Sequence, residues 1–333
     1  MTISSTNPLP RHEPPASLQA RLARVMPELE FRIHLPLIEA INRLKEERDA
    51  VILAHNYQTP EIFHGVADVV GDSLRLAREA AQTNAARIVV CGVHFMAETA
   101  KLLNPDKTVL IPDAGAGCSL AESITPEDVQ RLRAAYPDTP VVAYVNTSAE
   151  VKALSDVCCT SANAARIVTS LGVPRVIMIP DVFLARNVAA ATTVEIIAHH
   201  GRCIVHEQFK AGDIRELRQA DPGLAILAHP ECPPDVLQEA DFSGSTEAMA
   251  RWVGQHKPSR VVLLTECSMS DNVAVQHPEV DVQRPCNLCP YMKRITLAKI
   301  LECLETERDV VTIPPPIAQR ARQAIERMLQ LSA

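Results

Sequence analysis

The chain carries three copies of a segment roughly 85 to 89 residues long, and this internal repeat restricts the fold more than any other feature. Each copy contains an apolar run that ends in polar or aromatic residues: VILAHNY from residue 51, VVAYVNT from residue 141 and AILAHPE from residue 225. The residues near the ends of these runs, His55, Tyr144 and His229, are 89 and 85 residues apart. The repeat therefore predicts three similar structural units.

Two further sets of positions keep nearly the same spacing. In the first set, a hydroxyl side chain follows each run at the turn that opens a helix-like segment; its members are Ser73, Ser161 and Thr246, at intervals of 88 and 85. In the second set, an arginine begins each second apolar run; its members are Arg87, Arg175 and Arg260, also at intervals of 88 and 85. Agreement among independent sets makes a chance match improbable.

The pattern inside each repeat predicts the fold class. Short β-rich runs alternate with Ala-rich amphipathic segments, which is typical of βα units on a parallel sheet with right-handed crossovers. We therefore expect an α/β fold of three pseudo-threefold-related αβα domains, each with a small parallel sheet, around a central cleft. The expected ranges are 31–118 with the C-terminal helical segment 290–333, then 119–203, then 204–289. The Pro-rich stretch TNPLPRHEPPASLQ predicts a flexible leader over residues 1–30.

Charge and composition indicate which classes of partner this protein is expected not to bind. The chain has 333 residues, of which 47% are hydrophobic and 22% charged, as expected for a globular protein. Its net charge of −7 argues against nucleic acid as a partner. No stretch reads as a secretory signal or a membrane span, so a cytoplasmic location without a membrane partner is expected, with the ten cysteines reduced.

The repeated polar residues are expected to converge on one site. Ligands of parallel sheets gather at the carboxyl ends of the strands and at the helix N-termini that follow. The histidine and tyrosine set lies at those strand ends, and the hydroxyl set lies at or beside helix N-caps. Three helix N-termini facing one cleft would give an acidic protein a local site for anions.

Three of the cysteines follow the repeat. Cys118, Cys203 and Cys289 are 85 and 86 residues apart, whereas the other seven form no such set. Three thiolates can bind zinc or an iron–sulfur cluster. A four-iron cluster normally takes four cysteines, so binding by three would leave one iron open to act as a Lewis acid.

The stretch RPCNLCPYMKR, residues 284 to 294, contains the pair Cys286 and Cys289. Because the chain has no second CxxC, half of a zinc site is disfavoured. A redox dithiol stays open, since a CxxC before a helix can have a lowered thiol pKa. Only Cys289 fits the repeat, so Cys286 is expected not to be a ligand. A disulfide between the two under oxidising conditions also stays open.

The residues carry a family resemblance. AHNYQ, GDSL, AGCSL, YVNTSAE, CCTSANA, CIVHE, AHPECP, GSTEAM and CPYMKRITLAKI occur in this order over about residues 33 to 305, and they resemble the quinolinate synthase family of NAD biosynthesis. The resemblance implies a transferase that condenses iminosuccinate with dihydroxyacetone phosphate, releasing phosphate and two waters. It also implies one [4Fe-4S] cluster per chain, with Cys118, Cys203 and Cys289 as its ligands.

The same resemblance implies roles for individual residues. The acid/base candidates are Tyr57, His229 and Glu231. The substrate-binding candidates are His55, Ser73, Tyr144, Val145, Asn146, Ser161, His229, Pro230, Glu231 and Thr246. No nucleotide cofactor is implied, and functional coupling to an iminosuccinate-producing aspartate oxidase or dehydrogenase is expected. Two alternatives stay open: another [4Fe-4S]-dependent hydro-lyase, and a non-catalytic metal-binding protein.

Overall fold

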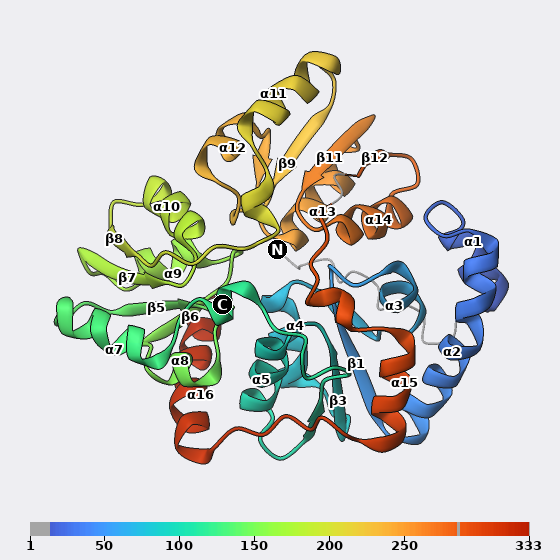
Figure 1. Cartoon of the computed structure of the whole chain (residues 1–333), viewed down its shortest axis with the longest axis horizontal. Coiled ribbons are helices and arrows are strands. Elements are labelled where there is room, and N and C mark those ends of the chain that lie inside the picture. The colour runs from blue at the N-terminus through green and yellow to red at the C-terminus, as the bar shows by residue number, and fades with distance from the viewer. Residues whose placement is uncertain (1–13, 285–286, 333) are drawn as a thin grey trace.

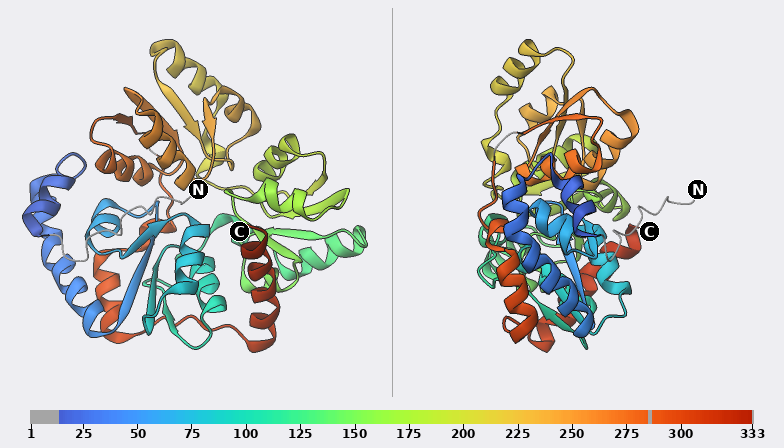
Figure 2. Two further views of the ribbon diagram at one scale, coloured as in Figure 1. Left: turned by 180° about the vertical axis from the view of Figure 1, so that it is seen from behind. Right: turned by 90° about the vertical axis from the view of Figure 1, so that its right-hand side faces the viewer.

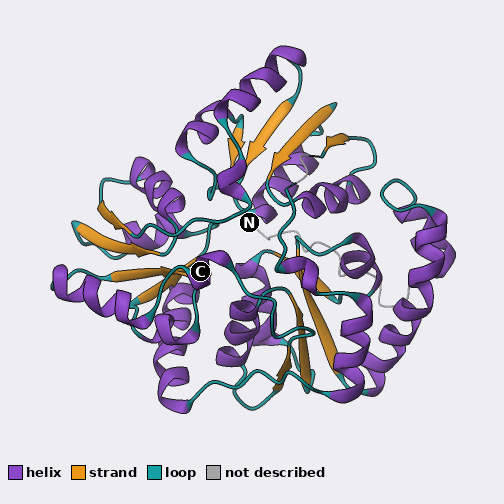
Figure 3. Ribbon diagram, in the orientation of Figure 1, coloured by secondary structure: helices purple, strands orange, loops and turns teal. Residues whose placement is uncertain are grey.

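The computed structural model describes residues 14–284 and 287–332, which form three lobes around a common centre (Figure 1). Each lobe has one four-stranded sheet flanked by helices (Figure 3). The strand orders are β2-β1-β3-β4, β6-β5-β7-β8 and β10-β9-β11-β12, so the first strand of each repeat always lies between the second and the third. The strands pair in parallel throughout each sheet. The expected α/β fold with three small parallel sheets is confirmed.

The strands are short, as expected for small domains. The first sheet has β1 (Ala50–His55), β2 (Val69–Gly71), β3 (Arg87–Cys91) and β4 (Thr108–Leu110). The second has β5 (Val141–Tyr144), β6 (Val157–Cys159), β7 (Arg175–Ile179) and β8 (Glu195–Ala198). The third has β9 (Ala225–Ala228), β10 (Phe242–Ser243), β11 (Arg260–Leu264) and β12 (Asp281–Gln283).

Helices connect the strands and cover the sheets. The first lobe has α3 (Pro60–Gly65), α4 (Ser73–Gln82) and α5 (His94–Leu103), followed by the short α6 (Ser119–Glu122). The second has α7 (Pro126–Ala135), α8 (Ala149–Ala153), α9 (Ala164–Ser170) and α10 (Val182–Ala191), followed by the 3-10 turn η1 (His206–Gln208). The third has α11 (Ala211–Ala220), α12 (Pro234–Glu239), α13 (Thr246–His256) and α14 (Cys267–Gln276), followed by the 3-10 turn η2 (Met292–Arg294).

The apolar core is divided unevenly among the lobes. One continuous cluster of buried side chains joins the first and second sheets. The third sheet has a separate cluster on each face: Ile226 and Val262 belong to one, and Leu227 and Leu263 to the other. This alternation follows from the two-residue period of a strand, which sends successive side chains to opposite faces. The continuous apolar runs of the sequence therefore correspond to strands covered on both faces.

The expected leader is wrong over its second half. Helix α1 (Pro15–Leu22) is already formed within it, and α2 (Glu28–Glu47) begins before residue 30. Leu18 and Leu22 are buried in α1, because residues four apart lie on one face of a helix and here that face joins the core of the first lobe. Residues 1–13 lie outside the part of the chain that the structure describes.

The C-terminal segment does not belong to the first lobe alone. Helix α15 (Leu297–Thr306) packs on α2, as expected for a first-lobe element. Helix α16 (Pro315–Leu331) instead packs mainly on α8 and β6 of the second lobe and also contacts α5 of the first. The two views in Figures 1 and 2 show this red helix between the two lobes. Its buried residues, Ala321, Ala324, Ile325 and Met328, explain why those lobes share one core.

Candidate functional site

The three lobes meet at a cavity with an empty volume of about 690 Å³. Twelve residues singled out from the sequence line it: His55, Tyr57, Ser73, Cys118, Tyr144, Asn146, Ser161, Cys203, His229, Glu231, Thr246 and Cys289. They come from all three repeats. The predicted convergence of strand ends, helix starts and cysteines is therefore present in the structure.

Two predicted residues do not line this cavity. Val145 is buried beside a smaller neighbouring cavity, which it shares with Ser73 and Phe95. The carbonyl of Pro230 accepts a hydrogen bond of 2.8 Å from the Asn187 side chain on α10. Both residues thus support the loops on which Asn146 and Glu231 are carried.

The histidines at the end of the first strand of the first and third repeats have the same local geometry. His55 ends β1 and His229 follows β9. The backbone N–H two residues later donates to Nδ1 in each case, from Tyr57 at 3.2 Å and from Glu231 at 3.3 Å. Because Nδ1 accepts, the proton of the neutral ring lies on Nε2, which is left as a hydrogen-bond donor. Burial lowers the pKa of both histidines to about 3, so both are neutral near pH 7.

The hydroxyl residues are placed just inside the helices, not at their caps. Ser73 is the first residue of α4, whose cap is Asp72, and Thr246 is the first residue of α13, whose cap is Ser245. The capping side chains accept from backbone N–H groups inside the first turn. Ser161 lies in the turn between β6 and α9, two residues before the N-cap position. Capping is therefore not the role of these three hydroxyls.

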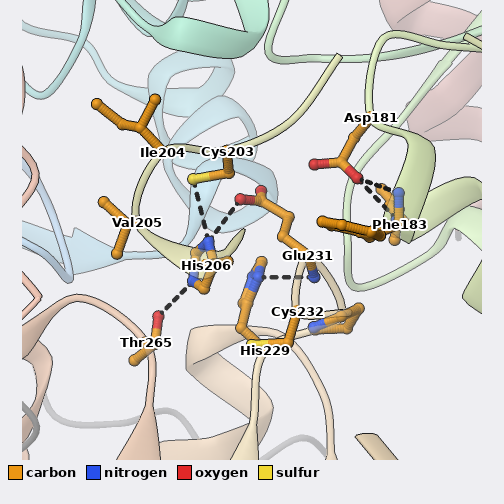
Figure 4. A network of polar contacts seen from close by, with 12 residues as sticks. Asp181, Phe183, Cys203, Ile204, Val205, His206, His229, Glu231, Cys232 and Thr265 are labelled. Carbon is orange, nitrogen blue, oxygen red and sulfur yellow. Dashed lines mark hydrogen bonds and ion pairs between the residues drawn. The ribbon is translucent and has the colours of Figure 1, made fainter. Parts of the chain in front are cut away.

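Glu231 is held by two side chains from other parts of the chain, of which Figure 4 shows His206. Its Oε2 lies 2.8 Å from Nδ1 of His206, and its Oε1 accepts a hydrogen bond of 2.5 Å from the Tyr144 hydroxyl. Burial alone would raise the pKa of Glu231, but the neighbouring rings of His206 and His229 hold it below its usual value. Glu231 is thus a buried carboxylate with both oxygens in fixed directions.

Tyr57 is the corresponding residue of the first repeat, two positions after His55. Its hydroxyl lies 2.5 Å from Oγ1 of Thr265, and that oxygen lies 2.9 Å from Nε2 of His206. Burial raises the pKa of Tyr57 well above its usual value, and so does the charge of Glu231; the same two causes act on Tyr144. Both tyrosines therefore carry their protons in this site.

His206 and Thr265 were not predicted from the sequence. His206 stacks on His229 with ring centroids 4.6 Å apart, and Thr265 is fully buried. The signal for His206 was its place in CIVHE, three residues after Cys203, where a tight turn returns the side chain to the cysteine. Its counterparts in the other repeats are Ala121 and Met292, so comparing the repeats could not reveal it.

The three cysteines have equivalent surroundings. Each sulfur accepts hydrogen bonds from the backbone N–H groups two and three residues later: Leu120 and Ala121 for Cys118, Val205 and His206 for Cys203, and Tyr291 and Met292 for Cys289. These bonds favour thiolates, whereas burial raises the pKa of all three thiols, that of Cys118 to about 12. A bound metal centre would resolve this conflict, because metal ligation holds cysteine as the thiolate.

Among the described residues, one compact group of possible metal ligands has all its ligand atoms within 4.8 Å of one another: Cys203, His206 and Glu231. Cys118 and Cys289 are not members of that group. Cys286 lies outside the described residues.

Cys289 is held in place by an ion pair between a buried carboxylate and a half-buried lysine. Glu266, at the start of α14, is fully buried, and its Oε1 lies 3.0 Å from Nζ of Lys293 and 3.4 Å from the Cys289 backbone N–H. Lys293 also donates to the Tyr57 carbonyl at 2.7 Å. This pair connects the cysteine-bearing segment of the third repeat to the first lobe.

Comparison with known proteins gives a consistent result. Residues 39–330 match the model of the family described as quinolinate synthetase A protein. Quinolinate synthase 1 of Mesorhizobium japonicum is 68% identical over 94% of this chain and 97% of its own length. Quinolinate synthase of Agrobacterium fabrum is 66% identical over 95% and 92%, and that of Caulobacter vibrioides 56% over 91% and 84%. Within the described residues, no helix is long and apolar enough to cross a membrane.

Proposed function

Because the chain belongs to the quinolinate synthetase A protein family, we propose that it is a quinolinate synthase of NAD biosynthesis, which condenses iminosuccinate with dihydroxyacetone phosphate. The reaction releases phosphate and two waters, and it needs no net oxidation or reduction. The observation that carries the proposal is the convergence of three equivalent cysteines and the buried Glu231 on one cavity. Functional coupling to an enzyme that produces iminosuccinate belongs to the same proposal.

The cofactor of the proposal is one [4Fe-4S] cluster, with Cys118, Cys203 and Cys289 as its ligands. The shared cavity of the three cysteines and the backbone N–H donors to their sulfurs support this assignment. When bound through three cysteines, such a cluster supplies one iron with an open position, which is a Lewis acid for a substrate oxygen.

Neutral donors bind the anionic substrates. No lysine or arginine is present among the described residues that line the cavity. The N-termini of α4 and α13 face it instead, together with the Ser73 hydroxyl and the Nε2–H groups of His55 and His229. Such donors stabilise carboxylate and phosphate oxygens without a second full charge. Asn146, whose Oδ1 is buried without a partner, adds an amide on the side of the second lobe.

Proton transfer is assigned to Glu231 and the tyrosines. Isomerising a triose phosphate and losing water both require a proton to leave carbon and another to reach oxygen. Glu231 can take a proton at Oε1, next to the Tyr144 hydroxyl, which can in turn give its proton to a leaving oxygen. Tyr57 is the matching donor on the side of the first lobe. Glu231 and Tyr144 are buried and Tyr57 is half-buried, which keeps bulk water from competing for these protons.

The test is an anaerobic assay of purified protein. Iron and sulfide are measured, and quinolinate is followed after iminosuccinate and dihydroxyacetone phosphate are added together or singly. We expect four irons per chain and quinolinate only when both substrates are present. Protein that is loaded with iron and sulfide but makes no quinolinate would contradict the assignment.

A further inference from the structure

The side chains of Cys203, His206 and Glu231 form a compact group within the larger site (Figure 4). Their ligand atoms all lie within 4.8 Å of one another, and Nδ1 of His206 is 3.1 Å from the Cys203 sulfur and 2.8 Å from Glu231 Oε2. We propose that these three residues form a second, mononuclear metal site for Zn²⁺ or a similar divalent cation, occupied when the iron–sulfur cluster is absent.

The donor set matches the preferences of zinc. A thiolate, an imidazole and a carboxylate are all regular zinc ligands, and three protein ligands with one open position are typical of a reactive zinc site. All three side chains line the central cavity, which gives the fourth position to water or a small anion. Binding replaces the Cys203 thiol proton, which leaves to solvent, and nothing is oxidised or reduced.

The outer contacts of the group support the assignment independently. A histidine that binds metal through one ring nitrogen generally donates the other N–H to an oxygen, and its carboxylate co-ligand is usually hydrogen-bonded too. His206 Nε2 lies 2.9 Å from Oγ1 of the buried Thr265. The second oxygen of Glu231 accepts from Tyr144 at 2.5 Å. Both outer partners are therefore already in place.

The mononuclear site and the cluster site share one ligand. Cys203 belongs to both, so a chain can bind Zn²⁺ at the small site or the cluster at the large one, but not both. This mutual exclusion rests on the proposed function, whereas Zn²⁺ binding itself does not. The consequence is that zinc would block cluster assembly by occupying one cysteine, with Cys118 and Cys289 still free.

The experiment uses the full chain, freed of iron and kept reduced without oxygen. Zn²⁺ binding is measured by calorimetry, and Co²⁺ is added separately because a thiolate–cobalt absorption band reports the bound cysteine. We expect one ion per chain. His206→Gln should weaken Zn²⁺ binding by at least about 100-fold, since losing an outer partner alone costs about 10- to 100-fold. The matched control is His64→Gln, a buried histidine on α3 that is not among the residues lining the cavity, which should bind Zn²⁺ normally.

The cysteine variants separate the two sites. Cys118→Ser and Cys289→Ser should keep the Zn²⁺ site while losing the cluster, and Cys203→Ser should lose both. Iron and sulfide reconstitution in the presence of Zn²⁺ should give fewer clusters in the wild type but not in His206→Gln. If His206→Gln fails to fold, Thr265→Val, which removes only the outer hydroxyl, should weaken Zn²⁺ binding by about 10-fold or more. The proposal is overturned if the wild type binds no Zn²⁺, or if binding needs Cys118 and Cys289 but not His206.

Discussion

The Tyr144 hydroxyl, at the end of β5 in the second repeat, donates a 2.5 Å hydrogen bond to Glu231, which follows β9 in the third. The contact crosses between two lobes and joins equivalent strand ends. The hydrogen bond forms only because both lobes present their strand ends to the same cavity. The repeat architecture therefore positions the carboxylate that we propose as the acid/base group.

Glu231→Gln tests the proton-transfer role. The amide can still accept from Tyr144, so we expect the fold and the iron content to be kept while turnover falls by about 100-fold or more, because a general acid/base is lost. Quinolinate formation, iron content and thermal unfolding are measured on one preparation. Wild-type turnover in a folded, iron-loaded variant would remove Glu231 from this role.

The cysteine assignment predicts a contrast within RPCNLCPYMKR. Cys289→Ser should lose the cluster absorbance and activity together, because a ligand is removed, and the same holds for Cys118 and Cys203. Cys286→Ser should keep both, since Cys286 falls outside the repeat spacing. Iron, sulfide and the visible spectrum are measured without oxygen. The reverse pattern would mean that Cys286 is the ligand.

Ser73→Ala separates anion binding from helix capping. Because Asp72 caps α4, the variant should unfold like the wild type. Losing a hydrogen bond to a charged substrate costs about 1.5 kcal/mol, so KM should rise roughly tenfold. Thr296→Ala is the matched control: it removes the cap of α15, which does not line the cavity, so the free energy of unfolding should fall by about 1 kcal/mol with KM unchanged. A capping role for Ser73 would instead lower stability and leave KM alone.

A buried carboxylate and a buried lysine connect the first two lobes. Glu98 on α5 accepts from the Ala149 backbone at 3.0 Å, and Lys152 on α8 lies 5.4 Å from the centre of the Phe95 ring on α5. Lys152→Met should lower the free energy of unfolding by about 1 kcal/mol or more, because the buried Glu98 loses a nearby positive charge that offsets the effect of burial on its pKa. The double variant Glu98→Gln with Lys152→Met should recover most of this loss in urea unfolding. Equal stability of the single and double variants would show that the two charges do not interact.

The fold could be predicted from the sequence because equivalent residues recur at the same positions in all three repeats. His55, Tyr144 and His229 recur at the same strand position, and strand-end geometry then places them at one edge. The residues two positions further on, Tyr57, Asn146 and Glu231, also line the cavity, as the period of an extended chain implies.

The features that could not be predicted are residues and contacts that are found in only one of the three repeats or that depend on tertiary packing. His206 has no counterpart in the other repeats, and Thr265 reaches the site only through the packing of one lobe against another. Helix α1 was misread because its proline-rich flank outweighed the spacing of Leu18 and Leu22. The contacts of α16 depend on tertiary packing, which local sequence does not report.

The division of the apolar core among the lobes affects the order in which they unfold. Because the first two lobes share one apolar cluster while the third has its own on each face of its sheet, we expect the third lobe to unfold separately from the first two. In native-state hydrogen exchange, the amides of β9 and β11 would open together, at a free energy different from that of β1 and β5. Since the third lobe carries Glu231 and His229, its local opening would dismantle the site while two thirds of the repeats stayed folded.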